Sequence, residues 1–210
     1  MNKLIFVLVL SFLFAASCSL NRSNTTSTNN QTNATPQASE TQAKTESTVA
    51  ETASKKDEKT VTKSDCAKIN TGDKQLLEKQ TFPVDFAPFE KSCFVTSYNP
   101  EYDNPPLEAE FAIYKDGKEV FDFPSQFNGV TFGCWVEAVA FEDLNGDNLK
   151  DIIVAGKCSA KSSDYNENMV YVNTGKAFTT SEDANYKISD FTKIKDINDF
   201  VKENKEIFFK

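Results

Sequence analysis

The feature that most constrains this chain is an abrupt change of composition near residue 62. From Ser19 to Thr62 the sequence has no aromatic residue, and after Leu20 its only branched aliphatic residues are Val49 and Val61. Such a stretch cannot bury enough apolar surface to offset the entropy that a chain loses on folding, so we expect it to be disordered. Only the remainder of the chain can therefore build a core.

That remainder, residues 63–210, has the length of one globular domain and contains Trp135 and most of the Phe residues. It carries 17 Lys and no Arg against 26 Asp and Glu, a net charge of −9. An acidic domain without a basic cluster argues against nucleic acid and anionic lipid surfaces as partners. The sequence also has no His, which excludes Ser-His-Asp and Cys-His catalysis and metal sites built on imidazole.

The first 17 residues have the pattern of a secretory signal peptide. Lys3 supplies a positive charge, residues 4–14 are almost wholly apolar, and the small residues Ala15-Ala16-Ser17 stand directly before Cys18. The apolar run is shorter than the roughly 20 residues that a membrane-spanning helix needs. We therefore expect residues 1–17 to be cleaved from an exported chain.

The four residues Ala15-Ala16-Ser17-Cys18 resemble the lipobox of bacterial lipoproteins, in which Leu is commoner at the first position. The resemblance implies acyl chains on Cys18, so that residues 18–62 tether a domain to the cell membrane, facing the periplasm or the cell exterior. Ser19 resembles the residue that permits transfer to the outer membrane, where the host has one. The alternative is a secreted protein in which Cys18 is incidental.

Alternating polar and apolar residues indicate three β-hairpins in the predicted domain. Residues 110–114 and 119–123 alternate around Asp116-Gly117, a pair that favours a tight turn because glycine accepts positive φ. The other two hairpins are predicted from residues 169–172 and 177–179, and from residues 134–141 and 151–158.

Helical periodicity is present in two further segments. Apolar residues recur at helical spacing from about residue 197 to residue 208, and a shorter helix is expected near residues 73–79. Three prolines indicate a loop over residues 99–106. Together with the hairpins, these features predict an α+β fold, with a mostly antiparallel β-sheet and short helices.

One segment combines residues that suit a metal ion. Carboxylate or amide side chains occupy positions 1, 3, 5 and 9 of the run from Asp143 to Asp151, and Gly146 permits a sharp bend. Calcium takes six to eight oxygen ligands in a flexible cage, which such a loop can supply. The segment is not an EF-hand, because its twelfth position is Val154 where a bidentate Glu is expected.

The segment from Phe141 to Val154 resembles the calcium loop of FG-GAP/VCBS repeats, which carry Asp-x-Asn/Asp-Gly-Asp-Gly-x-x-Asp between two strands. Asn148 stands where the family usually has Gly, and only one copy is present, so the resemblance covers one hairpin and does not imply a propeller. The alternative is an acidic turn whose Asp and Asn side chains bond only to the backbone. The resemblance implies the ligands Asp143, Asn145, Asp147 and Asp151 through side chains and Leu149 through its carbonyl.

Four cysteines in the predicted domain favour two disulfides, because an even number is typical of exported domains. Centring the third hairpin on Gly146 places Cys134 opposite Cys158, which leaves Cys66 to pair with Cys93. The alternative is a redox or metal site, but the sequence has no Cys-x-x-Cys motif and no His.

These features predict a non-catalytic, membrane-anchored envelope lipoprotein with a calcium-stabilised β-rich binding or accessory domain. We expect its partner to be an envelope protein or a glycan. The alternative is an exported enzyme, or an enzyme inhibitor, that acts on cell-envelope material. Glu137 and Glu142 are carboxylates from which an acid/base pair could be built, although scattered carboxylates on an acidic surface are more often solvated.

Overall fold

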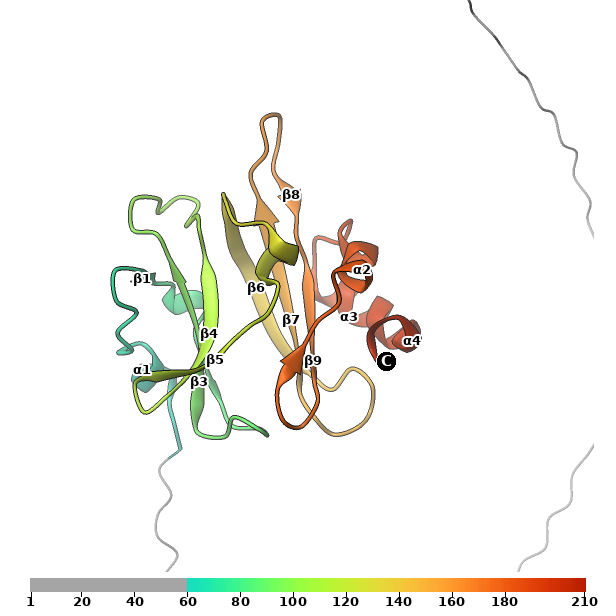
Figure 1. Ribbon diagram of the computed structural model, residues 1–210, viewed down its shortest axis with the longest axis horizontal. Helices are drawn as coiled ribbons and strands as arrows, with labels where there is room; N and C mark the ends of the chain where they lie inside the picture. The colour runs from blue at the N-terminus through green and yellow to red at the C-terminus, as the bar shows by residue number, and fades with distance from the viewer. Residues whose placement is uncertain (1–59) are drawn as a thin grey trace, which may run out of the picture. The chain divides into compact units, whose positions relative to one another are not determined.

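Residues 60–210 form two antiparallel β-sheets with a few short helices in a computed structural model (Figure 1). This architecture confirms the predicted α+β class. The predicted signal peptide, Cys18 and the tether up to residue 59 lie outside the described residues. None of the helices among residues 60–210 has the length and hydrophobicity that a membrane-spanning segment requires.

The first sheet has the strand order β1-β3-β4-β5, and β2 pairs with β3 on the same edge as β1. The hairpin predicted around Asp116-Gly117 is confirmed as β4 and β5. The strands of this sheet are β1 (Gln75–Leu76), β2 (Phe82–Val84), β3 (Ser92–Tyr98), β4 (Glu110–Lys115) and β5 (Lys118–Asp122).

The second sheet has the strand order β10-β9-β7-β6, and β8 pairs with β7 beside β9. The β6–β7 and β9–β10 pairs confirm the two other predicted hairpins. The strands of this sheet are β6 (Cys134–Glu142), β7 (Asp151–Cys158), β8 (Tyr165–Asn166), β9 (Met169–Asn173) and β10 (Phe178–Thr179).

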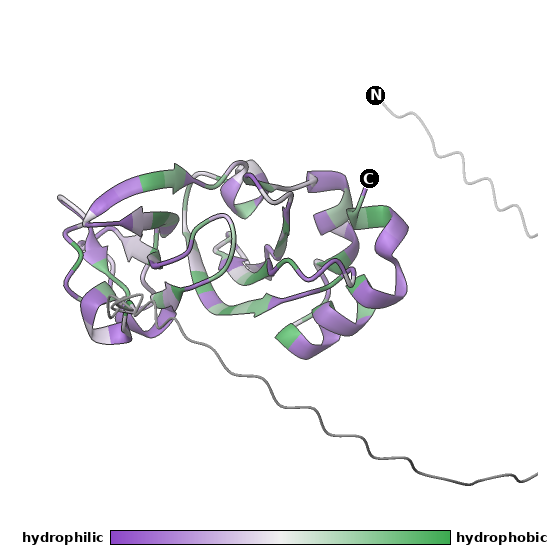
Figure 2. Ribbon diagram, turned by 90° about the horizontal axis from the view of Figure 1, so that it is seen from below, coloured by the Kyte–Doolittle hydropathy of each residue, from purple (hydrophilic) through white to green (hydrophobic). Residues whose placement is uncertain are grey.

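The two sheets face each other, helices cover the far side of the second sheet, and one short helix lies on the far side of the first (Figure 1). The second sheet is covered on both faces because the side chains of β7 alternate between two cores. Ile152 and Val154 point toward the first sheet, and Ile153 and Ala155 point toward the helices. In Figure 2 the strands of the second sheet lie between the first sheet and the helices. The domain is therefore layered as helix, sheet, sheet, helix.

The core between the sheets is built largely from aromatic rings. Phe94 and Phe111 of the first sheet lie 5.5 Å apart between ring centroids, and Phe123 lies 4.9 Å from Tyr171 of the second sheet. Edge-to-face and offset pairs of this kind add about 0.5–1.5 kcal/mol each beyond the area that they bury. The Phe-rich composition of the domain is thus used mainly to join its two sheets.

The helices on the far side of the second sheet end the chain. The periodic segment predicted over residues 197–208 is helical but interrupted at Asn204, whose side chain donates to the Phe200 carbonyl at 2.8 Å and closes the first helix. The helical elements of this layer are α2 (Glu182–Asn185), the 3-10 turn η3 (Tyr186–Ile188), α3 (Ile194–Glu203) and α4 (Lys205–Phe208).

The helix predicted near residues 73–79 is wrong. Gln75 and Leu76 form β1 opposite β3, and the backbone N–H of Leu77 donates to the Thr96 carbonyl at 2.8 Å. Only Glu78–Gln80 turn, as the short 3-10 element η1. Pairing with a strand distant in sequence satisfies the backbone here and overrides a weak local preference. The short helix of this region is α1 (Lys63–Cys66), on the far side of the first sheet.

Both predicted disulfides are present. Cys66–Cys93 joins α1 to β3, and Cys134–Cys158 joins the ends of β6 and β7 within the core between the sheets. The second bond depends on a β-bulge at Glu137, which shifts the pairing of β6 with β7 by one residue. Without the bulge, the pairing found near the connecting loop would place Trp135 opposite Cys158. Two disulfides indicate an extracytoplasmic domain.

The crossover from the first sheet to the second includes η2 (Gln126–Gly129) and is held tightly against β7. A side chain at Gly156 would place Cβ only 2.9 Å from the ring of Phe127, so the glycine permits this contact. Phe127 and Asn128 adopt positive φ values of 48° and 52°, which cost energy in residues other than glycine. The buried ring and the hydrogen bond from the Phe127 N–H to the Met169 sulfur, 2.8 Å, maintain this conformation.

Candidate functional site

The predicted calcium loop connects β6 to β7. The Asp143 carboxylate accepts backbone hydrogen bonds from Gly146 at 2.7 Å and from Asn148 at 3.0 Å. Gly146 and Asn148 have positive φ values of 90° and 68°, which curl the chain around Asp143. The Gly146 N–H is the main reason why the pKa of Asp143 lies below its usual value. The loop is thus organised around one carboxylate.

The middle of the loop is held by its own side chains as well. Asn145 Oδ1 accepts from the Asp147 N–H at 2.9 Å, and Asp147 Oδ1 accepts from the Leu149 N–H at 2.8 Å. The Asn145 amide also donates to Asp147 at 2.8 Å. From outside the loop, the Lys205 ammonium of α4 donates to the Asn145 carbonyl at 2.7 Å. The helical layer therefore supplies a cation to this acidic loop.

Asp151, the last predicted ligand, is fully buried and connects three parts of the fold. Its carboxylate accepts from the Leu144 N–H at 3.1 Å and from the Asn173 N–H of β9 at 2.9 Å. Burial raises the pKa of Asp151 to about 6, and the charges of Asp147 and Asp143 act in the same direction, against the two backbone donors. Asp151 therefore stabilises the fold through these hydrogen bonds, independently of any metal binding.

The five predicted ligands all lie in this loop, and their oxygens suit calcium chemically. Carboxylate and carbonyl oxygens that accept one hydrogen bond keep a second lone pair for an ion. Among residues 60–210, however, no group of three or more His, Cys, Asp or Glu side chains converges closely enough to hold a metal ion. The described loop has the hydrogen bonds of an acidic turn, and calcium binding stays a prediction.

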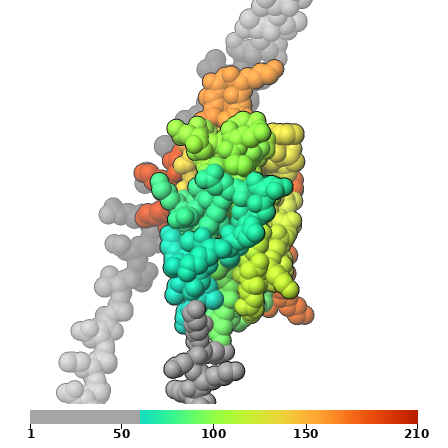
Figure 3. All heavy atoms as spheres, turned by 90° about the vertical axis from the view of Figure 1, so that its left-hand side faces the viewer, coloured from blue at the N-terminus to red at the C-terminus, as the bar shows by residue number. Residues whose placement is uncertain are grey.

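A second feature, which the sequence did not indicate, is a pocket of about 650 Å³ on the outer face of the first sheet. Its floor includes Ser97 of β3 and Glu110, Ala112 and Tyr114 of β4, and its wall is the segment from residue 129 to residue 134. Figure 3 looks onto this face, where the blue-green residues at the start of the described chain lie beside the yellow-green segment that follows β5. We call it the sheet pocket.

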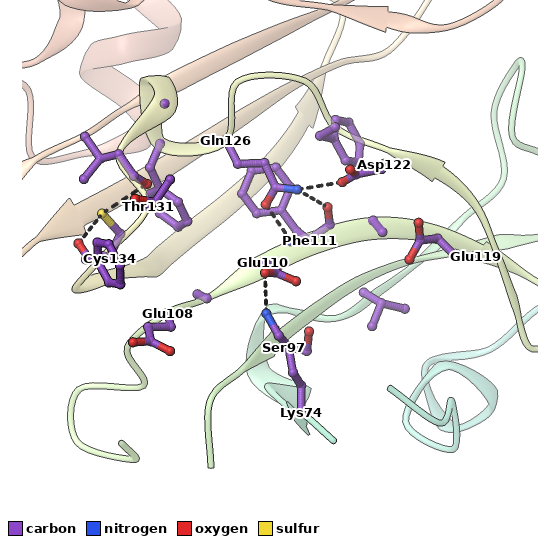
Figure 4. A pocket seen from close by; sticks show the side chains of 18 of the residues that line it. Lys74, Ser97, Glu108, Glu110, Phe111, Glu119, Asp122, Gln126, Thr131 and Cys134 are labelled. Carbon is purple, nitrogen blue, oxygen red and sulfur yellow. Dashed lines mark hydrogen bonds and ion pairs between the residues drawn. The ribbon is translucent and has the colours of Figure 1, made fainter. Parts of the chain in front are cut away.

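The wall of the sheet pocket is positioned by Gln126. Strand β5 ends at Asp122, and beyond that point the Gln126 side-chain amide pairs with β4 in place of a strand (Figure 4). It accepts from the Phe111 N–H at 2.9 Å, and its NH₂ group donates to the Phe111 carbonyl at 3.0 Å and to Asp122 at 2.9 Å. The edge of the sheet is thereby closed, and the pocket has a fixed boundary.

The sheet pocket is strongly acidic. Among residues 60–210, Lys74 is the one cation that lines it, and this lysine pairs with Glu110. Beside the charges stands the Phe132 side chain, which is 75% exposed. Partial burial, with the nearby Glu119, raises the pKa of Tyr114 and keeps its hydroxyl protonated. The carboxylates that line the pocket are Glu108, Glu110, Glu119 and Asp122.

The sheet pocket could not be predicted from the sequence. Strict alternation along residues 119–123 would place Glu119 and Asp122 on opposite faces of the strand, and the register shift between Ile113 and Tyr114 brings both to the pocket. Lys74 directly precedes β1, and Ser97 belongs to β3. Neither of these strands was predicted from the sequence. Only the pairing of the strands brings these residues to one surface.

The two carboxylates considered for catalysis are not brought together. Glu137 and Glu142 lie five positions apart on the extended strand β6, roughly 16 Å at about 3.3 Å per residue. Carboxylate pairs that hydrolyse glycosides are about 5–9.5 Å apart. Glu137 instead accepts a hydrogen bond from the Trp135 indole, whose ring is buried in the core beside the disulfide.

Comparison of the chain with protein-family models, with curated proteins and with solved structures found no match.

The buried hydrogen bonds of Asp151 should contribute strongly to the stability of the domain. Asp151→Ala leaves two buried backbone N–H groups without acceptors, and each such loss costs about 1–3 kcal/mol, so we expect the free energy of unfolding to fall by about 2–6 kcal/mol. Urea denaturation measures the difference. Asp103→Ala, at an exposed loop position, should change stability by less than about 0.5 kcal/mol. Equal stability of the two variants would contradict the role given to Asp151.

Proposed function

We propose that this chain is a non-catalytic, membrane-anchored envelope lipoprotein whose sheet pocket binds a positively charged segment of an envelope protein. The observation that carries the proposal is the charge of the pocket, in which four carboxylates and one lysine surround a cavity of about 650 Å³. Electrostatic complementarity selects partners of opposite charge and speeds their encounter. The exposed Phe132 adds an apolar contact at the rim.

The anchor in this proposal is the lipid on Cys18, and residues 18–62 are the tether. An export signal followed by Cys18 agrees with an extracytoplasmic domain that carries two disulfides. Two or more acyl chains hold a protein stably at a membrane, whereas one chain binds only marginally. A long tether lets the sheet pocket meet partners at a distance from the bilayer.

Calcium in this proposal is a structural staple. Asp143, Asp147 and Asp151 lie within one hairpin loop, and their mutual repulsion opposes closing it unless a cation is near. Lys205 supplies one positive charge to the loop, and a divalent ion would supply more. Because extracellular calcium modules bind with dissociation constants of about 10⁻⁴–10⁻³ M, we expect weak affinity.

Calcium should therefore raise the melting temperature relative to chelator, and magnesium should be less effective. An ion at 100 times its dissociation constant stabilises a fold by about 2.7 kcal/mol, which calorimetry detects. Asp147→Ala should remove most of the difference, while Asp103→Ala should keep it. Identical melting curves with calcium and with chelator would leave the loop as an acidic turn without a metal.

Replacing the lipidated residue tests the anchor. Cys18→Ser should move the protein from the membrane fraction to the soluble fraction, because the apolar run of the signal peptide is too short to span a bilayer. Mass spectrometry of the native mature protein should find acyl chains on Cys18. A mature chain that begins at another residue would refute the lipoprotein assignment.

The pocket itself can be tested with a labelled pentalysine peptide. Glu108→Gln combined with Glu119→Gln should weaken binding roughly two- to thirty-fold, because an exposed charge pair contributes about 0.2–1 kcal/mol. Fluorescence anisotropy at two salt concentrations measures the affinity and its electrostatic part.

A matched control removes the same charge elsewhere. Asp196→Asn combined with Glu203→Gln changes two exposed carboxylates of α3, on the other side of the second sheet. This pair should leave peptide affinity nearly unchanged. An equal loss with both pairs would mean that the peptide responds to net charge and does not bind in the sheet pocket.

A further inference from the structure

A second cavity, of about 660 Å³, opens beside β8, α2 and η3. None of its lining residues belongs to the sheet pocket or to the predicted calcium loop. It is lined by two tyrosines, Tyr165 and Tyr186, and by four carboxylates, Glu167, Glu182, Asp183 and Asp190, together with smaller polar residues. We call it the tyrosine pocket.

We propose that the tyrosine pocket binds a small organic cation whose charge is surrounded by apolar groups, of the alkylated or quaternary ammonium class. This goes beyond the proposed function, because it assigns a separate site and a different kind of ligand. The pocket lies within the volume range of small-molecule sites, about 300–1,000 Å³. Its lining supplies both parts of what such a cation needs: negative charge and aromatic surface.

The tyrosines provide the aromatic surface. Tyr186 is 74% exposed and Tyr165 is 40% exposed, although both are large rings that domains usually bury in part. The face of a tyrosine ring attracts a cation placed within about 6 Å of its centre. The Lys187 ammonium already lies 6.0 Å from the centre of the Tyr186 ring, which shows that a positive charge can approach this ring.

The carboxylates give the lining a net negative charge, and the Lys187 ammonium beside Tyr186 lies outside the lining. No lysine or arginine lines the tyrosine pocket, and none of its four carboxylates belongs to an ion pair within residues 60–210. A cavity lined by one sign of charge concentrates counter-ions of the opposite sign. An anion or a phosphate group would be repelled.

The arrangement favours a bulky cation over a bare metal ion. Calcium requires six to eight oxygens at about 2.3–2.6 Å. Among the described residues no three acidic side chains converge closely enough for a metal, and the four carboxylates come from separate segments: Glu167 follows β8, Glu182 and Asp183 belong to α2, and Asp190 follows η3. A cation with an apolar shell can fill that space, contact the rings and receive the field of several carboxylates at once.

One part of the lining, at Asn128, is held by hydrogen bonds. Asn128 donates to Glu167 at 2.7 Å and accepts from Asn185 at 2.8 Å, and Asn185 in turn accepts from the Val170 N–H at 3.0 Å. These bonds connect this part of the lining to the buried strand β9. A site whose polar groups are already fixed loses less entropy when its ligand binds.

Choline is a suitable probe, and 3,3-dimethyl-1-butanol, which has the same shape without the charge, is its control. The full lipidated protein in a maltoside detergent is titrated by calorimetry or ligand-observed NMR. Choline should bind at least about tenfold more tightly than the neutral analogue, because the carboxylates and ring faces act on its charge. Equal affinity for the two compounds would overturn the proposal.

Variants locate the binding. Tyr186→Ala should weaken choline binding about two- to thirty-fold, whereas Tyr186→Phe keeps the ring and should retain it. Glu182→Gln combined with Asp190→Asn should also weaken it. Tyr102→Ala removes another exposed tyrosine, outside the lining of the tyrosine pocket, and should have no effect. Loss of binding with Tyr102→Ala but not with Tyr186→Ala would refute the site.

Two further titrations distinguish the source of the cation. Phosphocholine should bind more weakly than choline, because its phosphate meets the four carboxylates; tighter binding of phosphocholine or of phosphatidylcholine vesicles would refute the repulsion on which the proposal rests. Calcium alone should not displace choline in the Asp147→Ala variant. Displacement there would assign the carboxylates to a metal ion and overturn the proposal.

Discussion

The burial of β7 on both faces is the constraint on which the other features depend. Residues Asp151–Gly156 are all buried, so this strand contributes to the core between the sheets and to the core under the helices. A strand in that position needs a hydrogen-bonded neighbour along each edge, and β6 on one side and β8 with β9 on the other supply them. Asp151, the first residue of β7, accepts hydrogen bonds from the Leu144 N–H of the loop and from the Asn173 N–H of β9, and so connects both to this strand.

The crossover between the sheets links this scaffold to the two proposed binding sites. Gln126 fixes one boundary of the sheet pocket, and Asn128, two residues later, fixes a wall of the tyrosine pocket. Between them Phe127 is locked against Gly156 of β7 in a backbone conformation that costs energy. Strained residues persist where the surrounding structure holds them, and they cluster at functional positions. The two pockets therefore share one rigid support.

The parts of the fold that were predictable from the sequence depend on neighbours close in the chain. Three hairpins were identified because their alternation and turns are local, and the nine-residue run from Asp143 to Asp151 could be recognised for the same reason. The pockets could not be predicted, because Lys74, Ser97 and Glu119 come together only through strand pairing. The helix expected near residues 73–79 failed because β1 pairs with β3 there.

The sequence by itself determined the acidic character of the chain, its three hairpins and a cysteine content that allows two disulfides, since composition, alternation and turn residues are local properties. The tertiary structure alone decided how those segments meet. The bulge at Glu137 sets the register that aligns Cys134 with Cys158, strand pairing gathers the lining of the sheet pocket, and the packing of α2 and η3 beside β8 forms the tyrosine pocket. The physical reason is that strand register and the packing of elements depend on contacts between residues far apart in the chain, which a local sequence pattern does not contain.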